Sequence, residues 1–109
     1  MTPYEIFEQA KAAALAAATA QNATLPPEAR RGFDCGFAWV IIKPARGPFV
    51  KYCKANRIGD KHCYGGWNIW YSHFSLPTQS VSVHEAAASA FAAVLVANGI
   101  DAYADSRLD

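Results

Sequence analysis

A run of β-branched and aromatic residues from Gly36 to Lys43 constrains the fold of this chain more than any other segment. Its composition is typical of a strand, and Pro44 ends it. Side chains alternate between the two sides of a strand, so one side carries Ala38, Val40 and Ile42, and the other carries Phe37, Trp39 and Ile41. Both sides are apolar. We therefore predict helices on the first side, and a helix, a second subunit or a ligand on the other.

Capping patterns predict the helices around this strand. Thr2-Pro3-Tyr4-Glu5 offers a capping hydroxyl, a proline at the first helical position and a glutamate, so a helix should run to about Ala20. Pro48 should begin a short basic helix. Ser82-Val83-His84-Glu85 is a second capping pattern, and it predicts a helix that Gly99 ends.

Two further strands are predicted, from Trp67 to about His73 and from Ile100 to about Tyr103 or Ala104. The segment from Asn56 to Gly66 contains turn-forming residues without a period, which is typical of a loop. The expected fold is α+β, in the order α-β-α-β-α-β, with about three helices packed on a small three-stranded sheet. With 109 residues, 52% of them hydrophobic, residues 1–109 should form one domain.

The amino-terminal residues predict neither a membrane span nor a signal peptide. The alanine-rich run from Ala12 to Ala20 is short and weakly apolar, and Glu5 and Glu8 precede it where a signal peptide carries basic residues. The chain has three cysteines, an odd number that favours reduced thiols. We expect a cytoplasmic protein.

Basic residues are concentrated in the middle of the chain, although its net charge is only +1. Eight of them lie between Arg30 and Lys61, against Asp34 and Asp60. Such a segment can be a solvated surface or a site for an anionic ligand.

The sequence contains residues that could form a thiol enzyme, a metal site or a phosphate-binding loop. Asp34-Cys35-Gly36 resembles, over a few residues, the Asp-Cys-Ser-Gly segment of NlpC/P60 cell-wall peptidases, but it lacks the serine and precedes a strand, so a Cys35 thiol hydrolase is a distant alternative. The cysteines and histidines lack zinc-site spacing, so no metal is expected. The glycines form neither a Walker loop nor a dinucleotide motif. We predict no enzymatic activity and no cofactor.

Ligand binding without catalysis agrees better with these residues. Tryptophan rings can stack on a base, basic side chains can neutralise phosphates, glycines permit close approach, and an anion is favoured where the last helix begins. The candidate ligand-binding residues are Arg57, Lys61, Gly65, Gly66, Trp67, Trp70, Gln79, Ser80 and Arg107.

Several segments together resemble a group of small proteins encoded by tailed bacteriophages and prophages. They are Gly36-Phe37-Ala38-Trp39-Val40, Tyr64-Gly65-Gly66-Trp67 with Trp70, Gln79-Ser80-Val81, Ala90-Phe91-Ala92 through Leu95, Gly99-Ile100 and Ser106-Arg107-Leu108-Asp109. The resemblance implies that the cytoplasm in question is that of an infected bacterial host. Small accessory phage proteins frequently act against host defence. The resemblance therefore implies a phage anti-defence protein.

The expected function is that of a non-enzymatic homo-oligomer that sequesters a nucleotide-derived signal through aromatic and basic residues. The alternative is an inhibitor that binds a host defence protein such as a nuclease effector. Neither membrane association nor direct nucleic-acid binding is expected.

Overall fold

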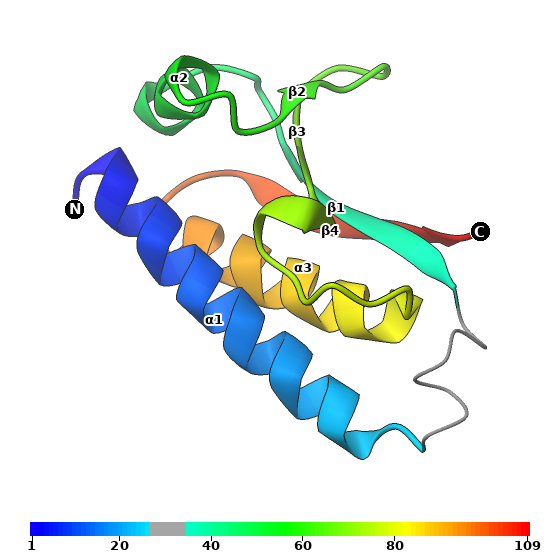
Figure 1. Cartoon of the computed structure of the whole chain (residues 1–109). Coiled ribbons are helices and arrows are strands. Elements are labelled where there is room, and N and C mark those ends of the chain that lie inside the picture. Colours follow the sequence, from blue (N-terminus) through cyan, green and yellow to red (C-terminus); the bar gives the residue numbers. More distant parts are fainter. Residues whose placement is uncertain (27–34) are drawn as a thin grey trace.

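Four strands form one antiparallel sheet in the computed structural model, which describes residues 1–26 and 35–109 (Figure 1). They are β1 (Gly36–Ile42), β2 (Asp60–Lys61), β3 (Trp67–Trp70) and β4 (Ala102–Leu108), in the spatial order β2-β3-β1-β4. The α+β class is confirmed, but the prediction of three strands is wrong. The additional strand, β2, has two residues and lies in the segment predicted to be a loop.

The central position of β1 follows from its two apolar sides. β1 pairs with β3 along one edge and with β4 along the other. Including the helices α2 (Pro48–Ala55) and α3 (Val81–Ala97), the order from β1 onward is β-α-β-β-α-β. This order, with β1 and β3 in the middle of the sheet, is the strand order of the split βαβ or ferredoxin-like topology, although α2 does not lie on the face of the sheet. Helix α1 (Pro3–Thr24) precedes it.

Helix α1 begins as predicted and extends beyond its predicted end. The Thr2 hydroxyl accepts a hydrogen bond from the Glu5 N–H at 3.2 Å, and the Glu5 carboxylate accepts one from the Thr2 N–H at 2.9 Å. Hydrogen bonding of the Glu5 carboxylate to the Thr2 backbone N–H, and to a smaller extent to the Thr2 side chain, lowers the pKa of the Glu5 carboxyl. The helix runs four residues past Ala20, because alanine and glutamine are good helix formers.

Helix α3 begins two residues earlier than the Ser82 pattern indicates. Ser80 is its N-cap residue and is buried, whereas Ser82 lies inside the helix. The prediction that Ser82 caps α3 is therefore wrong. The predicted end is confirmed, because Gly99 follows Asn98 with a φ of 79°, which favours glycine.

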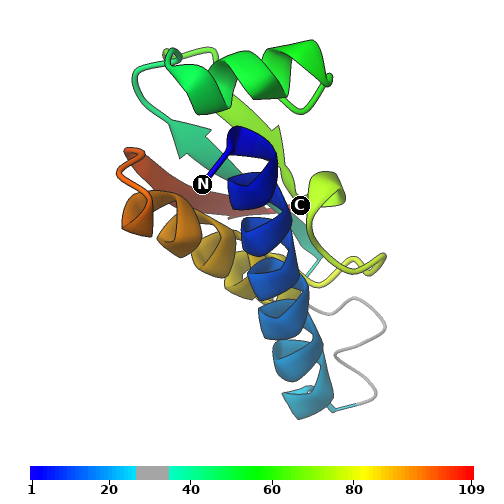
Figure 2. The same cartoon turned by 90° about the vertical axis from the view of Figure 1, so that its left-hand side faces the viewer.

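Helix α3 covers one side of the sheet and α1 packs along α3 on that same side, whereas α2 lies at the end where β1 stops (Figures 1 and 2). The expectation that all three helices pack on the sheet is thus confirmed for α3, whereas α1 joins the shared core beside α3 and α2 does not lie on the face of the sheet. Small side chains on both helices are fully buried, so their backbones approach closely. These are Ala10, Ala14, Ala18, Ala87 and Ala88. The buried face of α2 adds Phe49, Val50 and Cys53 to the same core.

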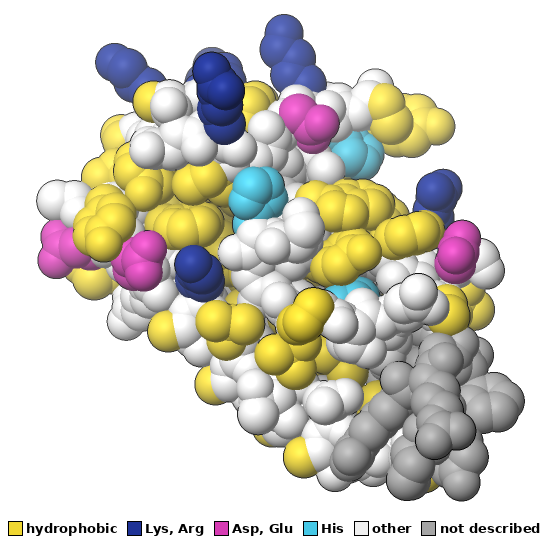
Figure 3. Space-filling model, in the orientation of Figure 1, with side chains coloured by type: hydrophobic (Ala, Val, Ile, Leu, Met, Phe, Trp, Pro, Cys, Tyr) yellow, Lys and Arg dark blue, Asp and Glu magenta, His cyan; other side chains and the backbone are white. Residues whose placement is uncertain are grey.

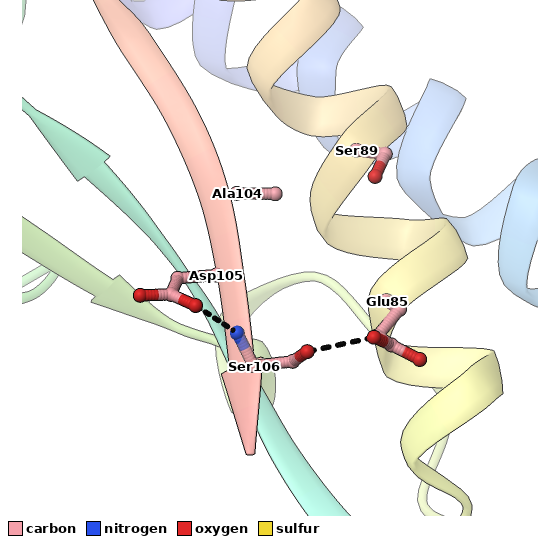
Figure 4. A pocket seen from close by; sticks show the side chains of 5 residues that line it. All are labelled: Glu85, Ser89, Ala104, Asp105 and Ser106. Atoms are coloured by element: carbon pink, nitrogen blue, oxygen red, sulfur yellow. Dashed lines mark hydrogen bonds between the residues drawn. The ribbon is translucent and has the colours of Figure 1, made fainter.

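Strand β4 is longer than predicted. It continues through Ser106 and Arg107 to Leu108, and pairs with β1 along its whole length. The Ser106 hydroxyl donates a hydrogen bond to the Glu85 carboxylate at 2.7 Å, which ties β4 to α3 across a small pocket (Figure 4). The long-range pairing with β1 stabilises this strand, and the local sequence does not reveal it.

Strand β3 is shorter than predicted. It ends at Trp70, and Tyr71–His73 form a 3-10 turn. Within the described ranges, no helix combines the length and the apolar character needed to cross a membrane.

Candidate ligand-binding face

One side of the sheet lies opposite α1 and α3, and we call it the open face. The register places Trp39 beside Trp70 and Asp105, and Phe37 beside Arg107. Because side chains alternate along a strand, these residues point away from the core that contains Ala38, Val40 and Ile42. The open face therefore carries Phe37, Trp39, Ile41, Asn68, Trp70, Tyr103, Asp105 and Arg107.

Four aromatic rings contact one another along β1 and β3, and we call them the aromatic ladder: Phe37, Trp39, Trp70 and Tyr71. The rings of Trp39 and Trp70 are stacked, with centroids 5.4 Å apart and planes 9° apart. Phe37 lies 5.6 Å from Trp70 and 6.3 Å from Tyr71. All four are partly exposed, whereas Ile41 beside them is buried. The ladder thus covers Ile41 and still presents ring surface to solvent.

Tyr71 links the ladder to α3. Its ring stacks on the His84 ring with centroids 4.0 Å apart, and His84 is fully buried. The His84 Nε2 lies 2.7 Å from the Thr78 carbonyl, and the Nδ1 lies 2.7 Å from the Ser75 hydroxyl. Since a carbonyl only accepts, Nε2 carries a proton, and in the neutral ring Nδ1 accepts from the Ser75 hydroxyl. These bonds hold His84 as a fixed support for the Tyr71 end of the ladder.

Two polar atoms on the open face are buried and have no hydrogen-bond partner within residues 1–26 and 35–109. They are the indole Nε1 of Trp39, a donor, and the amide Oδ1 of Asn68, an acceptor. An unsatisfied buried group costs about 1–3 kcal/mol, so such atoms require an explanation. Trp67 provides the contrast, because its Nε1 donates to the Ile58 carbonyl at 2.9 Å.

Arg107 marks one end of the open face. Its guanidinium lies over the Phe37 ring, 5.7 Å from the centroid. A pocket of about 180 Å³ adjoins this end and is lined by Phe37, Tyr71, Gln79, Cys35, Gly36 and Asp109. The predicted residues Trp70, Gln79 and Arg107 are therefore brought to the same end of the molecule, around Phe37 and Tyr71.

Lys43 marks the opposite end of the open face. It follows β1 at the next position in the alternation of Phe37, Trp39 and Ile41. A Cβ added at Gly66 would lie 2.8 Å from the Lys43 Cγ and 3.2 Å from the Ile41 Cγ2, so both side chains border the same glycine. Gly66 also has a φ of 92°. Its role is to let the turn before β3 pack against the end of β1.

Exposed basic side chains gather around α2 and β2, at the Lys43 end (Figure 3). Six basic residues and one acidic residue, Asp60, lie between positions 43 and 61, and within the described part of the chain none of the six forms an ion pair. We call this surface the basic end; it consists of Lys43, Arg46, Lys51, Lys54, Arg57 and Lys61. The part of the predicted basic segment at Arg30, Arg31 and Asp34 lies outside the described residues.

Several predicted site residues are not on the open face. Trp67 is 6% exposed and packs in the core, so it offers no stacking surface. Lys61 pairs with Trp67 rather than with Asn68, and Asp60 takes the open-face position instead. Ser80 is buried at the start of α3. Arg57 and Gly65 are exposed at the basic end.

The Cys35 environment differs from that of a peptidase nucleophile. Cys35 forms a β-bridge with Ser80 immediately before β1, and its thiol donates to the Gln79 side-chain carbonyl at 3.4 Å. It therefore lies on extended backbone that pairs with the N-cap residue of α3, whereas the peptidase cysteine is itself the first residue of a helix. Among the described residues there is no group of His, Cys, Asp and Glu arranged to hold a metal ion.

The site list from sequence lacks Phe37, Trp39, Asn68 and Tyr71. The sequence does contain a signal for Phe37 and Trp39, because a strand with two apolar sides needs a partner that covers the second side. Asn68 and Tyr71 carried no such signal, since their positions depend on the pairing of β3 with β1 and on the 3-10 turn.

Comparisons of the chain with protein-family models, with curated proteins and with solved structures give no significant match. The functional interpretation therefore depends on the chemistry of the open face.

Proposed function

We propose that this chain is a non-enzymatic binding protein whose open face stacks the base of a nucleotide-type ligand. The observation that carries the proposal is the aromatic ladder on β1 and β3, the two central strands, on the side that α1 and α3 leave uncovered. Aromatic rings on a sheet bind bases through their π faces, and each stacked base contributes about 1–3 kcal/mol.

Arg107 supports the same interpretation. Its guanidinium is exposed beside Phe37, where it can neutralise a phosphate or stack on a base. Gln79 and the pocket next to Phe37 add hydrogen-bonding groups at the margin of the face. This arrangement provides stacking, charge and polar contacts within one surface.

The biological role that we propose is sequestration of a nucleotide-derived signal during phage infection. It rests on the resemblance to small phage proteins together with the ladder. A sequestering protein holds its ligand unchanged, so the ligand recovered after denaturation should be identical to the ligand added.

Thermal shift and tryptophan fluorescence test this function. Cyclic dinucleotides, cyclic trinucleotides and cyclic ADP-ribose derivatives, each far above its dissociation constant, should raise the melting temperature and change the fluorescence of Trp39 and Trp70. Trp70→Leu should abolish the shift. Tyr4→Leu, which removes an exposed aromatic ring on α1, should preserve it. If no nucleobase-containing compound produces either signal, the proposal is wrong.

A second candidate function uses the basic end. Its six exposed cations would attract an acidic host protein, and their effect would weaken as salt rises. In a pull-down from host lysate, Lys51→Gln with Lys54→Gln should reduce capture of such a protein, whereas Trp70→Leu should not. Capture that both variants leave unchanged would exclude this function.

A further inference from the structure

We propose that the open face binds a single strand of nucleic acid, with two or three bases on the aromatic ladder and flanking phosphates near Arg107 and Lys43. This inference rests on the proposed function, because the same ladder makes the contacts. It departs from the sequence-based expectation that nucleic acid is not bound directly.

The shape of the open face favours binding of a nucleic-acid strand over binding of a single nucleotide. Small-molecule sites are concave, with volumes of about 300–1,000 Å³ that enclose most of the ligand. Four pockets among the described residues have volumes of about 90, 180, 220 and 290 Å³. Trp39 and Trp70 line none of these four. A flat stacking surface gains affinity by binding several bases in succession.

The positions of two basic side chains agree with a nucleic-acid strand that crosses the sheet parallel to β1. Arg107 pairs with Phe37 at one end, and Lys43 follows Ile42 at the other. Six residues of extended backbone separate Phe37 from Lys43, which corresponds to about 20 Å. One mononucleotide cannot reach both ends, whereas a strand with two or three stacked bases between them can. Beyond Lys43 the strand would meet the rest of the basic end.

The acidic residues of the open face indicate whether the bases or the phosphates of the nucleic-acid strand face the protein. Asp105 lies beside Trp39 on the open face, and Asp60 lies beside Asn68. Both would repel a phosphate placed over the middle of the sheet, whereas a carboxylate accepts hydrogen bonds from the amino groups of bases. The bases should therefore point toward the sheet, and the phosphates should run outside it between the two terminal cations.

The unpartnered Trp39 Nε1 and Asn68 Oδ1 provide a donor and an acceptor for the same base edges. Neither atom is exposed, so each becomes available to a base only when the side chains around it move. Binding should therefore change the environment of the Trp39 indole, which fluorescence reports directly.

Fluorescence anisotropy with labelled oligo(U) and oligo(dT) of about eight nucleotides tests the inference, with UMP and TMP as competitors. Both oligonucleotides should bind at least about tenfold more tightly than the mononucleotides, which is about 1.4 kcal/mol for one further stacked base. A preference for oligo(U) would indicate contacts to the 2′-hydroxyls.

Variants locate the strand. Phe37→Leu and Trp70→Leu should each weaken oligonucleotide binding about tenfold or more. Arg107→Gln and Lys43→Gln, at exposed positions where folding is not at risk, should each reduce the salt dependence of log K by about 0.7. Lys11→Gln on α1 removes the same charge from the helix side and should change neither quantity.

The binding measurements distinguish failure of the strand inference from failure of the proposed function. If mononucleotides bind as tightly as oligonucleotides, the strand inference is overturned while the proposed function stands. If neither class binds, both are overturned. If oligonucleotides bind but Trp70→Leu, Arg107→Gln and Lys43→Gln behave like Lys11→Gln, a strand is bound elsewhere, and its assignment to the open face is wrong.

Discussion

Two tryptophans on neighbouring strands have opposite roles, and the hydrogen bonding of their indoles distinguishes them. Trp67 donates to the Ile58 carbonyl within the core, whereas Trp39 Nε1, on the open face, has no partner among the described residues. A core side chain satisfies its polar groups inside the fold. A side chain that faces a ligand can leave one unsatisfied until the ligand binds.

The two indoles should respond differently to phenylalanine. Trp67→Phe leaves the buried Ile58 carbonyl without its partner, so it should lower the free energy of unfolding by about 1–3 kcal/mol. Trp39→Phe removes a donor that has no acceptor, so its cost should be smaller by about that amount. Urea denaturation of both variants measures the difference. Equal losses of stability would contradict this interpretation of Trp39.

The cysteines differ in reactivity because they differ in burial. Cys53 is fully buried, and burial raises the pKa of its thiol from 9.0 to about 12, whereas Cys63 is exposed. A thiol reagent near neutral pH should therefore modify Cys63 rapidly and Cys53 only after unfolding. Labelling of Cys53 at the rate of Cys63 in the folded protein would refute its placement in the core.

The same burial makes stability depend on alkaline pH. Between about pH 9 and 12 the unfolded chain loses the Cys53 proton while the folded chain keeps it, so stability falls as pH rises, by up to about 1.4 kcal/mol per pH unit. Cys53→Ala should have a shallower decline over this range, measured by denaturant titration at each pH. Parallel curves for the two proteins would contradict the raised pKa.

At the scale of elements, strand β4 forms an edge of the sheet and is protected there by a side chain. The Asp109 N–H donates to the Cys35 carbonyl, and the Lys43 N–H donates to the Asp101 carbonyl. Odd-numbered residues of β4 therefore pair with β1, and the backbone groups of even-numbered residues point outward. The outward N–H of Ser106 donates to the Asp105 carboxylate at 2.8 Å, so it is occupied.

Removal of that carboxylate should expose the edge. Asp105→Ala frees the Ser106 N–H and removes a charge that repels another strand, so self-association should increase. Asp101→Ala removes the same charge at the start of β4 without freeing an N–H and serves as the control. Light scattering across a concentration series compares them. Equal association of both variants would show that charge, and not the exposed edge, is responsible.

The elements differ in how far the sequence predicts them. Helix α1 and strand β1 have strong local signals, a capping box and an unbroken apolar run, and both begin where predicted. Strand β2 has only Asp60 and Lys61, with no period to detect, and it exists because it pairs with β3. For helix α3 the capping motif at Ser82 predicts the wrong start. The N-cap residue is Ser80, which is buried, and Ser82 lies in the first turn of the helix.

At the scale of the whole molecule, the sequence predicts an uncovered aromatic side but not its composition. The two apolar sides of β1 are evident from alternation, so the need for a partner follows from residues 36–43 alone. The neighbours of Trp39 depend on which strands flank β1, and pairing of segments far apart in the chain leaves no local trace. Alternation alone places Trp67 and Trp70 on opposite sides of their strand, but it does not show which of them shares a side with Trp39; the register with β1 makes that residue Trp70.

A homo-oligomer remains a prediction, and the open face is where we expect copies to meet. If the aromatic ladder is the contact between copies, a bound oligonucleotide must compete with it. Analytical ultracentrifugation should then show an oligomer that oligo(U) dissociates. An oligomer that persists at saturating oligo(U) would place the contact elsewhere.

The position of Asp109 bears on how any of these experiments is set up. Its backbone N–H bonds to Cys35 beside β1, and its side chain lines the pocket next to Phe37. Met1 lies on the other side of the molecule, next to Pro48 and Gly99 (Figure 1). An affinity tag or fluorescent reporter attached after Asp109 would therefore begin at the aromatic ladder and obstruct it. The same tag attached before Met1 leaves that surface accessible.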